Sequence, residues 1–217
     1  MKKKYKLLVY DLDGTIVDSR KDVIKILNNL RYSLGKERLK KKFYTKFLSI
    51  GGNEMIKNTL EIDEPRKINL YLKKFRSNYF NSKKIKNLLY KNVLNTLKLL
   101  KKKNFLIALC TNKPRKLTIK ILKNKNILKY FDKIVAGGDI AETKPNSKYL
   151  KIIKKFFNVK YKDMVLIGDS TIDQKLAEKC NVDFFQFTPG YNDGINKKKV
   201  KSFLQNHKDI LKEITTK

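Results

Sequence analysis

Two carboxylates separated by a single residue, Asp11 and Asp13, follow a short apolar run near the beginning of the chain. Gly14 comes next and lets the backbone make the tight turn that brings its polar groups close to a ligand. Carboxylates placed in this way can hold a cation, can act as a nucleophile with an acid–base partner, or can do both. A calcium-binding loop is less well supported, because such a loop carries a Glu at its twelfth position, which here, counted from Asp11, is Asp22.

Polar side chains follow three further apolar runs. Thr111 and Asn112 offer a hydroxyl and an amide that can bind phosphate oxygens, although a threonine at this place also suits an ordinary helix N-cap. Lys144 can neutralise a phosphoryl group, but a single lysine among 46 carries little weight by itself. Asp169 and Asp173 flank a predicted helix start, and a carboxylate there can complete the oxygen ligands that Mg²⁺ prefers.

The segments that carry these side chains alternate between short apolar runs and longer amphipathic stretches. Continuous apolar runs are typical of strands that are covered on both faces, as in a parallel sheet. Strands that alternate with helices over short connections predict right-handed βαβ units, and therefore an α/β fold with a doubly wound parallel sheet. The predicted strands are residues 6–10, 105–110, 133–136, 164–167 and 183–187, and the predicted helices are residues 85–103, 114–125, 146–157 and 172–180.

One long segment, residues 17–82, contains helical patterns and no credible strand. We expect it to form a small α-helical cap that is inserted after the first strand of an α/β core, the core being residues 1–16 and 83–217. Open α/β sheets bind their ligands at the carboxyl ends of their strands, so the cap is expected above that edge of the sheet.

Lysine dominates the charge of the chain. The formal net charge of +32 by itself suggests a polyanionic partner. However, the basic residues comprise 46 lysines and only 6 arginines, whereas surfaces that read phosphates and bases favour the bidentate fork of arginine. We therefore expect a solvated lysine coat and no specific nucleic-acid site. Residues 196–217 are predicted to form a lysine-rich helix of this coat, with apolar side chains such as Phe203 facing inward and the single histidine, His207, at the surface.

The apolar runs and the cysteines of the chain indicate the cellular compartment in which we expect it. No apolar run approaches the roughly 20 residues that span a bilayer, and the early stretch 7–10 is too short for the core of a signal peptide. Cys110 and Cys180 are too few for a disulfide scaffold and lack the spacing of metal ligands. We therefore expect a cytoplasmic protein with no membrane partner, for which a monomer and a homodimer are both open.

The polar residues that follow the four predicted strands occur in a characteristic order along the chain. This order resembles that of the haloacid dehalogenase-like hydrolase superfamily, and the resemblance covers roughly residues 4–191. Within the superfamily the chain is similar to the phosphoglycolate phosphatase-like group, whose core is Rossmann-like and whose helical cap follows the first motif. Gly51, Gly52 and Asn53 resemble the cap loop of that group. The matching motifs are Asp-x-Asp-Gly-Thr at 11–15, Thr111 after a strand, Lys144-Pro145, and Gly-Asp-Ser-x-x-Asp at 168–173.

The resemblance implies a role for each matching acid. Asp11 would be the nucleophile that becomes an aspartyl phosphate. Asp13 would protonate the leaving oxygen and would then deprotonate the water that hydrolyses the intermediate. The cofactor would be Mg²⁺, bound by the carboxylates of Asp11 and Asp169 and by the main-chain carbonyl of Asp13.

The resemblance also implies which residues bind the phosphoryl group. Thr111, Asn112 and Lys144 would contact its oxygens, and Lys144 would take part in catalysis because a carboxylate attacks an anionic phosphate only when their repulsion is cancelled. Asp173 would orient Lys144 or the metal, with Ser170 beside it in a supporting position.

We therefore expect a Mg²⁺-dependent phosphatase that hydrolyses a small phosphorylated metabolite, a phosphomonoester of the phosphoglycolate or sugar phosphate type. A phosphosugar mutase of the same superfamily is an alternative, although Thr15 favours the phosphatase because such mutases often carry Val there. A non-catalytic, lysine-rich nucleic-acid-binding protein is an alternative from another class. Against it stands the set of Asp11, Asp13 and Asp169, which binding alone does not require.

Overall fold

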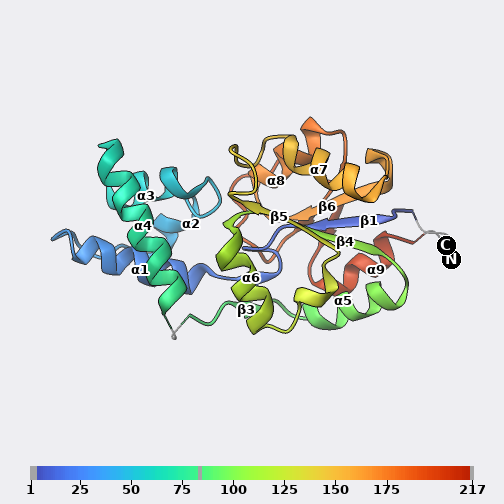
Figure 1. The fold of residues 1–217 in the computed structure, drawn as a ribbon, viewed down its shortest axis with the longest axis horizontal. Coiled ribbons are helices and arrows are strands. Elements are labelled where there is room, and N and C mark those ends of the chain that lie inside the picture. The colour runs from blue at the N-terminus through green and yellow to red at the C-terminus, as the bar shows by residue number, and fades with distance from the viewer. Residues whose placement is uncertain (1–3, 83–84, 216–217) are drawn as a thin grey trace. The chain divides into compact units, whose positions relative to one another are not determined.

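The chain divides into two compact units, and the computed structural model describes residues 4–82 and 85–215 of it (Figure 1). The first unit comprises Met1–Asp18 and Leu89–Lys217, and the second comprises Ser19–Leu88. The second unit coincides with most of the segment 17–82 for which the sequence predicts a helical cap, but it continues to Leu88. Across the described residues, no helix combines the length and the hydropathy that crossing a membrane requires.

A six-stranded sheet with the order β5-β4-β1-β6-β7-β8 forms the centre of the first unit, and its pairings are parallel. Because β1 lies between β4 and β6, the strand order reverses there, and open α/β sheets bind ligands at such a point. Tyr10 at the end of β1 is paired with Leu109 and Ile167, so the three strands end at one edge. The strands are β1 (Leu7–Tyr10), β4 (Leu106–Pro114), β5 (Lys133–Gly137), β6 (Met164–Gly168), β7 (Asp183–Phe187) and β8 (Ser202–Leu204).

Helices cover both faces of this sheet (Figure 1). α7 and α8 contact strands on one face, and α5 and α6 lie on the other, where both contact η1. The predicted α/β fold with a doubly wound parallel sheet is therefore confirmed. The helices are α5 (Val93–Lys102), α6 (Arg115–Asn124), α7 (Lys148–Phe157), α8 (Thr171–Lys179) and α9 (Ile210–Glu213), and the 3-10 turns are η1 (Leu128–Tyr130), η2 (Tyr161–Asp163), η3 (Lys197–Lys199) and η4 (His207–Asp209).

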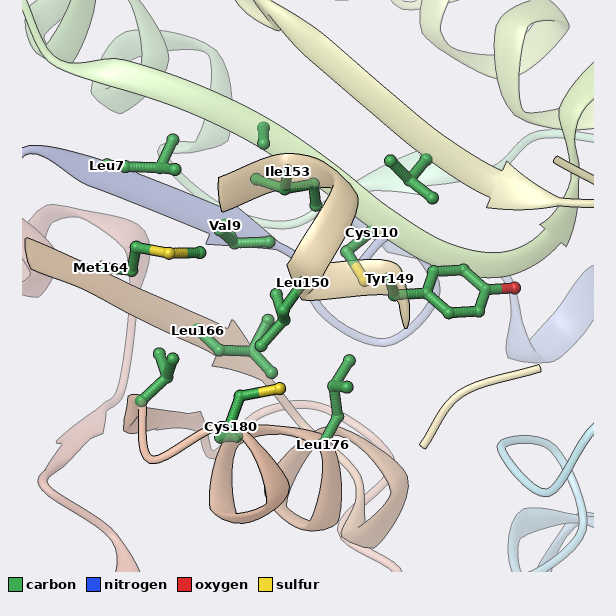
Figure 2. Close-up of a cluster of buried hydrophobic side chains, with 14 of the residues drawn as sticks. Leu7, Val9, Cys110, Tyr149, Leu150, Ile153, Met164, Leu166, Leu176 and Cys180 are labelled. Atoms are coloured by element: carbon green, nitrogen blue, oxygen red, sulfur yellow. The ribbon is translucent and has the colours of Figure 1, made fainter. Parts of the chain in front are cut away.

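An apolar cluster fills the space between the sheet and the pair α7 and α8 (Figure 2). Leu7 and Val9 of β1 belong to it, together with Leu150 and Ile153 of α7 and Leu176 of α8. Since side chains alternate along a strand, the remaining residues of β1 point to the opposite face. All four residues of β1 are buried, because helices cover the sheet on both sides. This burial holds the central strand, and the loop that follows it, in one place.

The second unit is helical. Its helices are α1 (Arg20–Tyr32), α2 (Lys41–Thr45), α3 (Gly52–Leu60) and α4 (Pro65–Asn81), and α1 contacts each of the other three. Arg31 is buried and donates to the main-chain oxygens of Glu37, at 2.7 Å, and Thr59, at 2.8 Å. It also forms an ion pair with Glu61 at 3.1 Å. Because a buried guanidinium is stable only when its donors are satisfied, Arg31 ties the end of α1 to the end of α3 and to the loop that contains Glu37.

The helix predicted over residues 85–103 is shorter than expected, because α5 begins only at Val93. Leu88 and Leu89 form the strand β3 (Leu88–Leu89), which pairs with β2 (Val17–Asp18), a short strand that the sequence pattern did not predict. The φ angles of Asn87 and Asn92 are 42° and 66°, which places both in the left-handed region. Asparagine adopts this conformation more readily than most residues, so the two positions interrupt the helical pattern.

The long helix predicted over residues 196–217 is wrong. Within its described part, the chain forms the short elements η3, β8, η4 and α9. The side chains of Asn196 and Asn206 accept hydrogen bonds from the main-chain N–H groups two residues later, at 3.1 and 2.8 Å. Such local bonds favour turns over a continuous helix. β8 instead extends the sheet by pairing with β7, and Phe203 is 46% exposed rather than inward-facing.

His207 is also not at the surface, since only 1% of it is exposed. Its Nε2 lies 2.8 Å from the main-chain oxygen of Thr15, and because a carbonyl only accepts, Nε2 carries the hydrogen and donates it. The imidazole stacks on Tyr10, with ring centroids 6.1 Å apart, and packs against Phe187 at 4.6 Å. Burial lowers the pKa of His207 to about 4, so the folded protein holds the ring neutral.

The neutral burial of His207 predicts that the protein loses folding stability as the pH falls. The ordinary pKa of histidine is 6.5, and that of His207 in the folded protein is about 4. Between these two pH values His207 is protonated in the unfolded chain and neutral in the folded chain, so the folded state loses stability as the pH falls. Neutral burial of His207 should therefore cost up to about 3 kcal/mol of folding free energy across this window. His207→Gln keeps an N–H donor without the titrating ring. Urea unfolding at pH 7 and pH 4.5 should show a smaller loss of stability in this variant than in the wild type.

Lys208→Gln provides the matched control, because Lys208 is an exposed neighbour on the same turn. Acidic groups titrate in all three proteins, so only the difference between them reports on the imidazole. If His207→Gln and the wild type lose the same free energy between the two pH values, the buried neutral histidine is not the cause.

Candidate active site

Three buried carboxylates meet at the carboxyl edge of the sheet. Asp11 follows β1, Asp169 follows β6, and Asp173 lies in the first turn of α8. Each offers a carboxylate oxygen, and these oxygens all lie within 4.8 Å of one another. Because three carboxylates so close together repel one another strongly inside a protein, positive charge must lie among them.

Lys144 supplies part of that charge. Its Nζ donates to Oδ1 of Asp11 at 2.6 Å, to Oδ1 of Asp173 at 2.7 Å and to the main-chain oxygen of Cys110 at 3.0 Å. The Lys144 side chain is only 4% exposed, so all three donors of the ammonium are used without water. Burial by itself lowers the pKa of Lys144, but the Asp11 and Asp173 carboxylates outweigh that effect and leave this pKa well above its usual value.

Asn112 positions the backbone that carries this lysine. Its side-chain Oδ1 accepts from the main-chain N–H of Lys144 at 2.7 Å, and its Nδ2 donates to the main-chain oxygen of the same residue at 3.3 Å. The loop that follows β5 is thereby fastened to the end of β4. The side-chain amide that the sequence analysis assigns to a phosphoryl group is thus engaged with Lys144, so we expect any contact of Asn112 with phosphate to come from its main-chain N–H.

Asp173 and Ser170 form a reciprocal cap at the beginning of α8. Oγ of Ser170 donates to Oδ2 of Asp173 at 2.6 Å, and the main-chain N–H of Ser170 approaches the same oxygen at 3.3 Å. A capping box of this kind satisfies donors at a helix start and fixes the side chains that make it. Because its other oxygen binds Lys144, Asp173 couples the start of α8 to the lysine.

Asp169 is held by groups from two other loops. Oγ1 of Thr15 donates to its Oδ1 at 2.9 Å, and the main-chain N–H of Tyr191 donates to its Oδ2 at 2.7 Å. A Cβ added at Gly14 would lie 2.1 Å from that Oδ2, and one added at Gly190 would lie 2.2 Å from the Asp169 Cβ. Only glycine fits at either position. Thr15 and Tyr191 are partners of Asp169 that the sequence analysis did not assign, although Thr15 lies inside the first motif.

The charge of the cluster favours a divalent cation. Three carboxylates and one ammonium leave two negative charges uncompensated when all are ionised. Burial raises the pKa of Asp11 to about 7, with a contribution from the Asp173 charge that Lys144 opposes. Burial, followed by the Asp173 and Asp11 charges, raises the pKa of Asp169 well above its usual value. Oxygen ligands with this surplus charge fit Mg²⁺, which prefers carboxylate and carbonyl oxygens.

Asp13 lies at the more open side of the site. Its side chain is 22% exposed, and its Oδ2 forms an ion pair with Nζ of Lys113 at 3.0 Å. Thr111 lies in β4 beside this pair and accepts a hydrogen bond from the main-chain N–H of Lys113 at 3.2 Å through its Oγ1. Sequence reasoning missed Lys113, because a lysine two residues after Thr111 does not stand out among 46 lysines.

The remaining predicted residues belong to the other unit. Gly51 precedes α3 with a φ of 104°, a conformation that favours glycine, and Gly52 and Asn53 are the first residues of that helix. Their assignment as a cap loop stays a prediction.

The chain is similar to known proteins along most of its length. Residues 8–187 match the sequence pattern of the haloacid dehalogenase-like hydrolase family. A phosphoglycolate phosphatase of Aquifex aeolicus is 30% identical over 174 residues, which cover 80% of each chain. A phosphoglycolate phosphatase of Colwellia psychrerythraea is 31% identical over 196 residues, or 87% of this chain and 86% of the relative.

Solved structures share the fold. The crystal structure of a predicted phosphoglycolate phosphatase from Haemophilus somnus superimposes with a TM-score of 0.90 at 24% identity, and it covers 98% of this chain and 99% of its own. The structure of CbbY from Rhodobacter sphaeroides in complex with phosphate superimposes with a TM-score of 0.79 at 17% identity, covering 97% and 99%. At these identities the likeness supports the fold alone.

Removing the Lys144 ammonium from the buried ion cluster should lower the stability of the protein strongly. Lys144→Met keeps an unbranched side chain, shorter by one atom, but leaves Asp11 and Asp173 without their shared partner. The free energy of unfolding should fall by about 3–5 kcal/mol. Urea unfolding at pH 8 in EDTA, where no added cation replaces the lost charge, measures this difference.

Lys148→Met is the matched control, because Lys148 follows in the same part of the chain, pairs with Glu142 and has a 57% exposed side chain. Its substitution should change the free energy of unfolding by no more than about 0.5 kcal/mol. Equal stability of the two variants would contradict a buried, obligatory ion cluster.

Proposed function

The chain belongs to the haloacid dehalogenase-like hydrolase family, and on that premise we propose that it is a Mg²⁺-dependent phosphatase, a phosphoric monoester hydrolase that acts through an aspartyl phosphate. The observation that carries the proposal is the contact of Lys144 with Asp11 and Asp173 beside Asp169, at the edge where the strand order reverses. Relatives named phosphoglycolate phosphatase make 2-phosphoglycolate the first substrate to test. A small phosphorylated metabolite in the cytoplasm is the proposed substrate class.

The proposed reaction begins at Asp11. Its carboxylate oxygen forms a bond to phosphorus, the ester P–O bond breaks, and Asp13 gives a proton to the departing alkoxide oxygen. Lys144 fixes the orientation of the Asp11 carboxylate through Oδ1 and places positive charge beside the phosphoryl group. The Thr111 hydroxyl offers a further donor at the end of the neighbouring strand.

The second half of the reaction releases phosphate. Asp13, now ionised, takes a proton from water while that water attacks phosphorus, and the bond from phosphorus to the Asp11 oxygen breaks. Asp13 is suited to this exchange because its side chain is partly exposed, whereas Asp11 is almost enclosed. Mg²⁺, when bound by the Asp11 and Asp169 carboxylates and the Asp13 main-chain carbonyl, supplies charge that lowers the repulsion between nucleophile and phosphate.

Replacing the nucleophile is the first test. Asp11→Asn keeps the shape of the side chain and removes its nucleophilic charge, so release of phosphate from p-nitrophenyl phosphate should fall on the order of 10³-fold or more. The circular dichroism spectrum should stay that of the wild type. Asp163→Asn is the matched control, since Asp163 ends the turn η2 just before β6, at the opposite edge of the sheet. Wild-type turnover by Asp11→Asn would refute the assignment of the nucleophile.

The metal requirement is tested separately. Activity should disappear in EDTA and return with excess Mg²⁺. Asp169→Asn should raise the Mg²⁺ concentration for half-maximal activity by at least about 10-fold, because even residues that only support a metal ligand change affinity by that factor. The measurement is a Mg²⁺ titration of initial rates, and an unchanged midpoint would remove Asp169 from the set of ligands.

A further inference from the structure

His207 lies outside the part of the chain that matches the family, because that match ends at residue 187. It is nevertheless buried against the first motif, with only 1% of it exposed, and its Nε2 donates to the main-chain oxygen of Thr15 at 2.8 Å. The proposed reaction gives this histidine no role. Its contact therefore reaches the first motif from a segment to which the family resemblance assigns no function.

The surroundings of His207 fix the position of its ring. Strand β8 pairs with β7 and leads the chain into the turn η4, where the carboxylate of Asp209 accepts from two main-chain N–H groups, both at 2.9 Å. The imidazole packs against the rings of Tyr10 and Phe187, with centroid distances of 6.1 and 4.6 Å. These contacts hold the Nε2 donor of His207 against Thr15.

Thr15 connects this histidine with Asp169. Its main-chain oxygen accepts from His207, and its hydroxyl donates to Oδ1 of Asp169 at 2.9 Å. Thr15 is entirely buried, and the χ1 angle of a β-branched side chain is stiff. A shift of the Thr15 backbone therefore changes the direction from which its hydroxyl reaches Asp169.

The direction of that hydroxyl matters because Asp169 is a proposed ligand of Mg²⁺. Thr15 holds its Oδ1, and the main-chain N–H of Tyr191 holds its Oδ2 at 2.7 Å. Mg²⁺ demands nearly ideal octahedral geometry, so a small rotation of a ligating carboxylate weakens its binding. Loss of a group that orients a metal ligand typically lowers metal affinity by about 10- to 100-fold.

We propose that His207 is a positioning residue for the metal site. It holds the backbone of Thr15 so that the Thr15 hydroxyl keeps Asp169 in the orientation that binds Mg²⁺. His207 touches neither substrate nor metal and acts only through Thr15. The inference rests on the proposed function, and it makes the metal affinity depend on a segment near the end of the chain.

Two amide substitutions separate the donor of His207 from the rest of its side chain. In His207→Gln the amide nitrogen takes the place of Nε2 and still donates to Thr15. In His207→Asn the side chain is one carbon shorter, and its amide does not reach. Isothermal titration with Mg²⁺ at pH 8 should show about 3- to 10-fold weaker binding by His207→Asn, the worth of one hydrogen bond, and nearly wild-type binding by His207→Gln. Equal affinities of the two variants would overturn the inference.

A double-mutant cycle tests whether His207 acts through Thr15. Thr15→Val removes the hydroxyl but keeps the branched shape, and it should weaken Mg²⁺ binding by about 10- to 100-fold. Once the hydroxyl is absent, the double variant Thr15→Val/His207→Asn should bind Mg²⁺ no more weakly than Thr15→Val alone. If His207→Asn causes the same fold loss with and without the hydroxyl, the histidine acts by another route and the inference fails.

Ile153→Val is the matched control for a general loss of stability. Ile153 belongs to the same apolar cluster as Val9, whereas His207 packs on Tyr10, the next residue of β1, and so on the other face of the sheet. The control should unfold more easily but keep the wild-type Mg²⁺ affinity. His207→Phe, which keeps a packed ring without a donor, should bind Mg²⁺ as weakly as His207→Asn. A loss in Ile153→Val as large as theirs would reduce the effect to stability and overturn the inference.

Kinetics provides a second readout. In His207→Asn the Mg²⁺ concentration for half-maximal hydrolysis of p-nitrophenyl phosphate should rise by the same factor as in the titration, while kcat at saturating Mg²⁺ stays close to the wild type. A lower kcat with an unchanged midpoint would contradict a role in metal binding. If the wild type binds Mg²⁺ but hydrolyses no phosphate ester, the proposed function fails, and the titrations still decide the role of His207. If the wild type binds no Mg²⁺, both fail.

Discussion

The ammonium group of Lys144 sets the geometry of this site, because it is buried and uses each of its donors on a protein oxygen. It contacts Asp11 after β1, Cys110 in β4 and Asp173 in α8. Charged groups in such surroundings are tolerated only when each is paired, so the loops that carry them have few alternative positions. Asn112 extends the same constraint to the backbone of the lysine itself. Phosphoryl transfer relies on positioning and charge, and both depend on these contacts.

Asp169 is constrained in another way, by two glycines that leave room for its side chain. Gly14 and Gly190 approach its carboxylate from two loops, and a Cβ at either place would overlap it. Thr15 and the backbone of Tyr191 complete its surroundings. His207, in turn, binds the main-chain oxygen of Thr15 from a segment near the end of the chain. The first motif is thus held by residues from two distant segments, which gives the buried His207 a structural role.

Much of the core was predictable because its signals are local. Residues 7–10 and 164–167 are apolar throughout, as is typical of a strand that is covered on both faces, and both lie in strands of the sheet. The same reasoning failed where a few hydrogen bonds decide between competing conformations. Residues 196–217 have a helical composition, yet caps formed by Asn196 and Asn206, together with pairing of β8 to β7, replace the predicted helix.

The sequence by itself determined the class of fold and the family, and it pointed to the acids that the structure brings together, since strand-end motifs are short and their chemistry is carried by residue type. Only the tertiary structure decided which groups are partners. The ion pair of Asp13 with Lys113 and the bond of His207 to Thr15 join residues far apart in the chain. No local pattern encodes such pairs, because they form only when parallel strands align their carboxyl ends and burial makes every unpaired charge or donor costly.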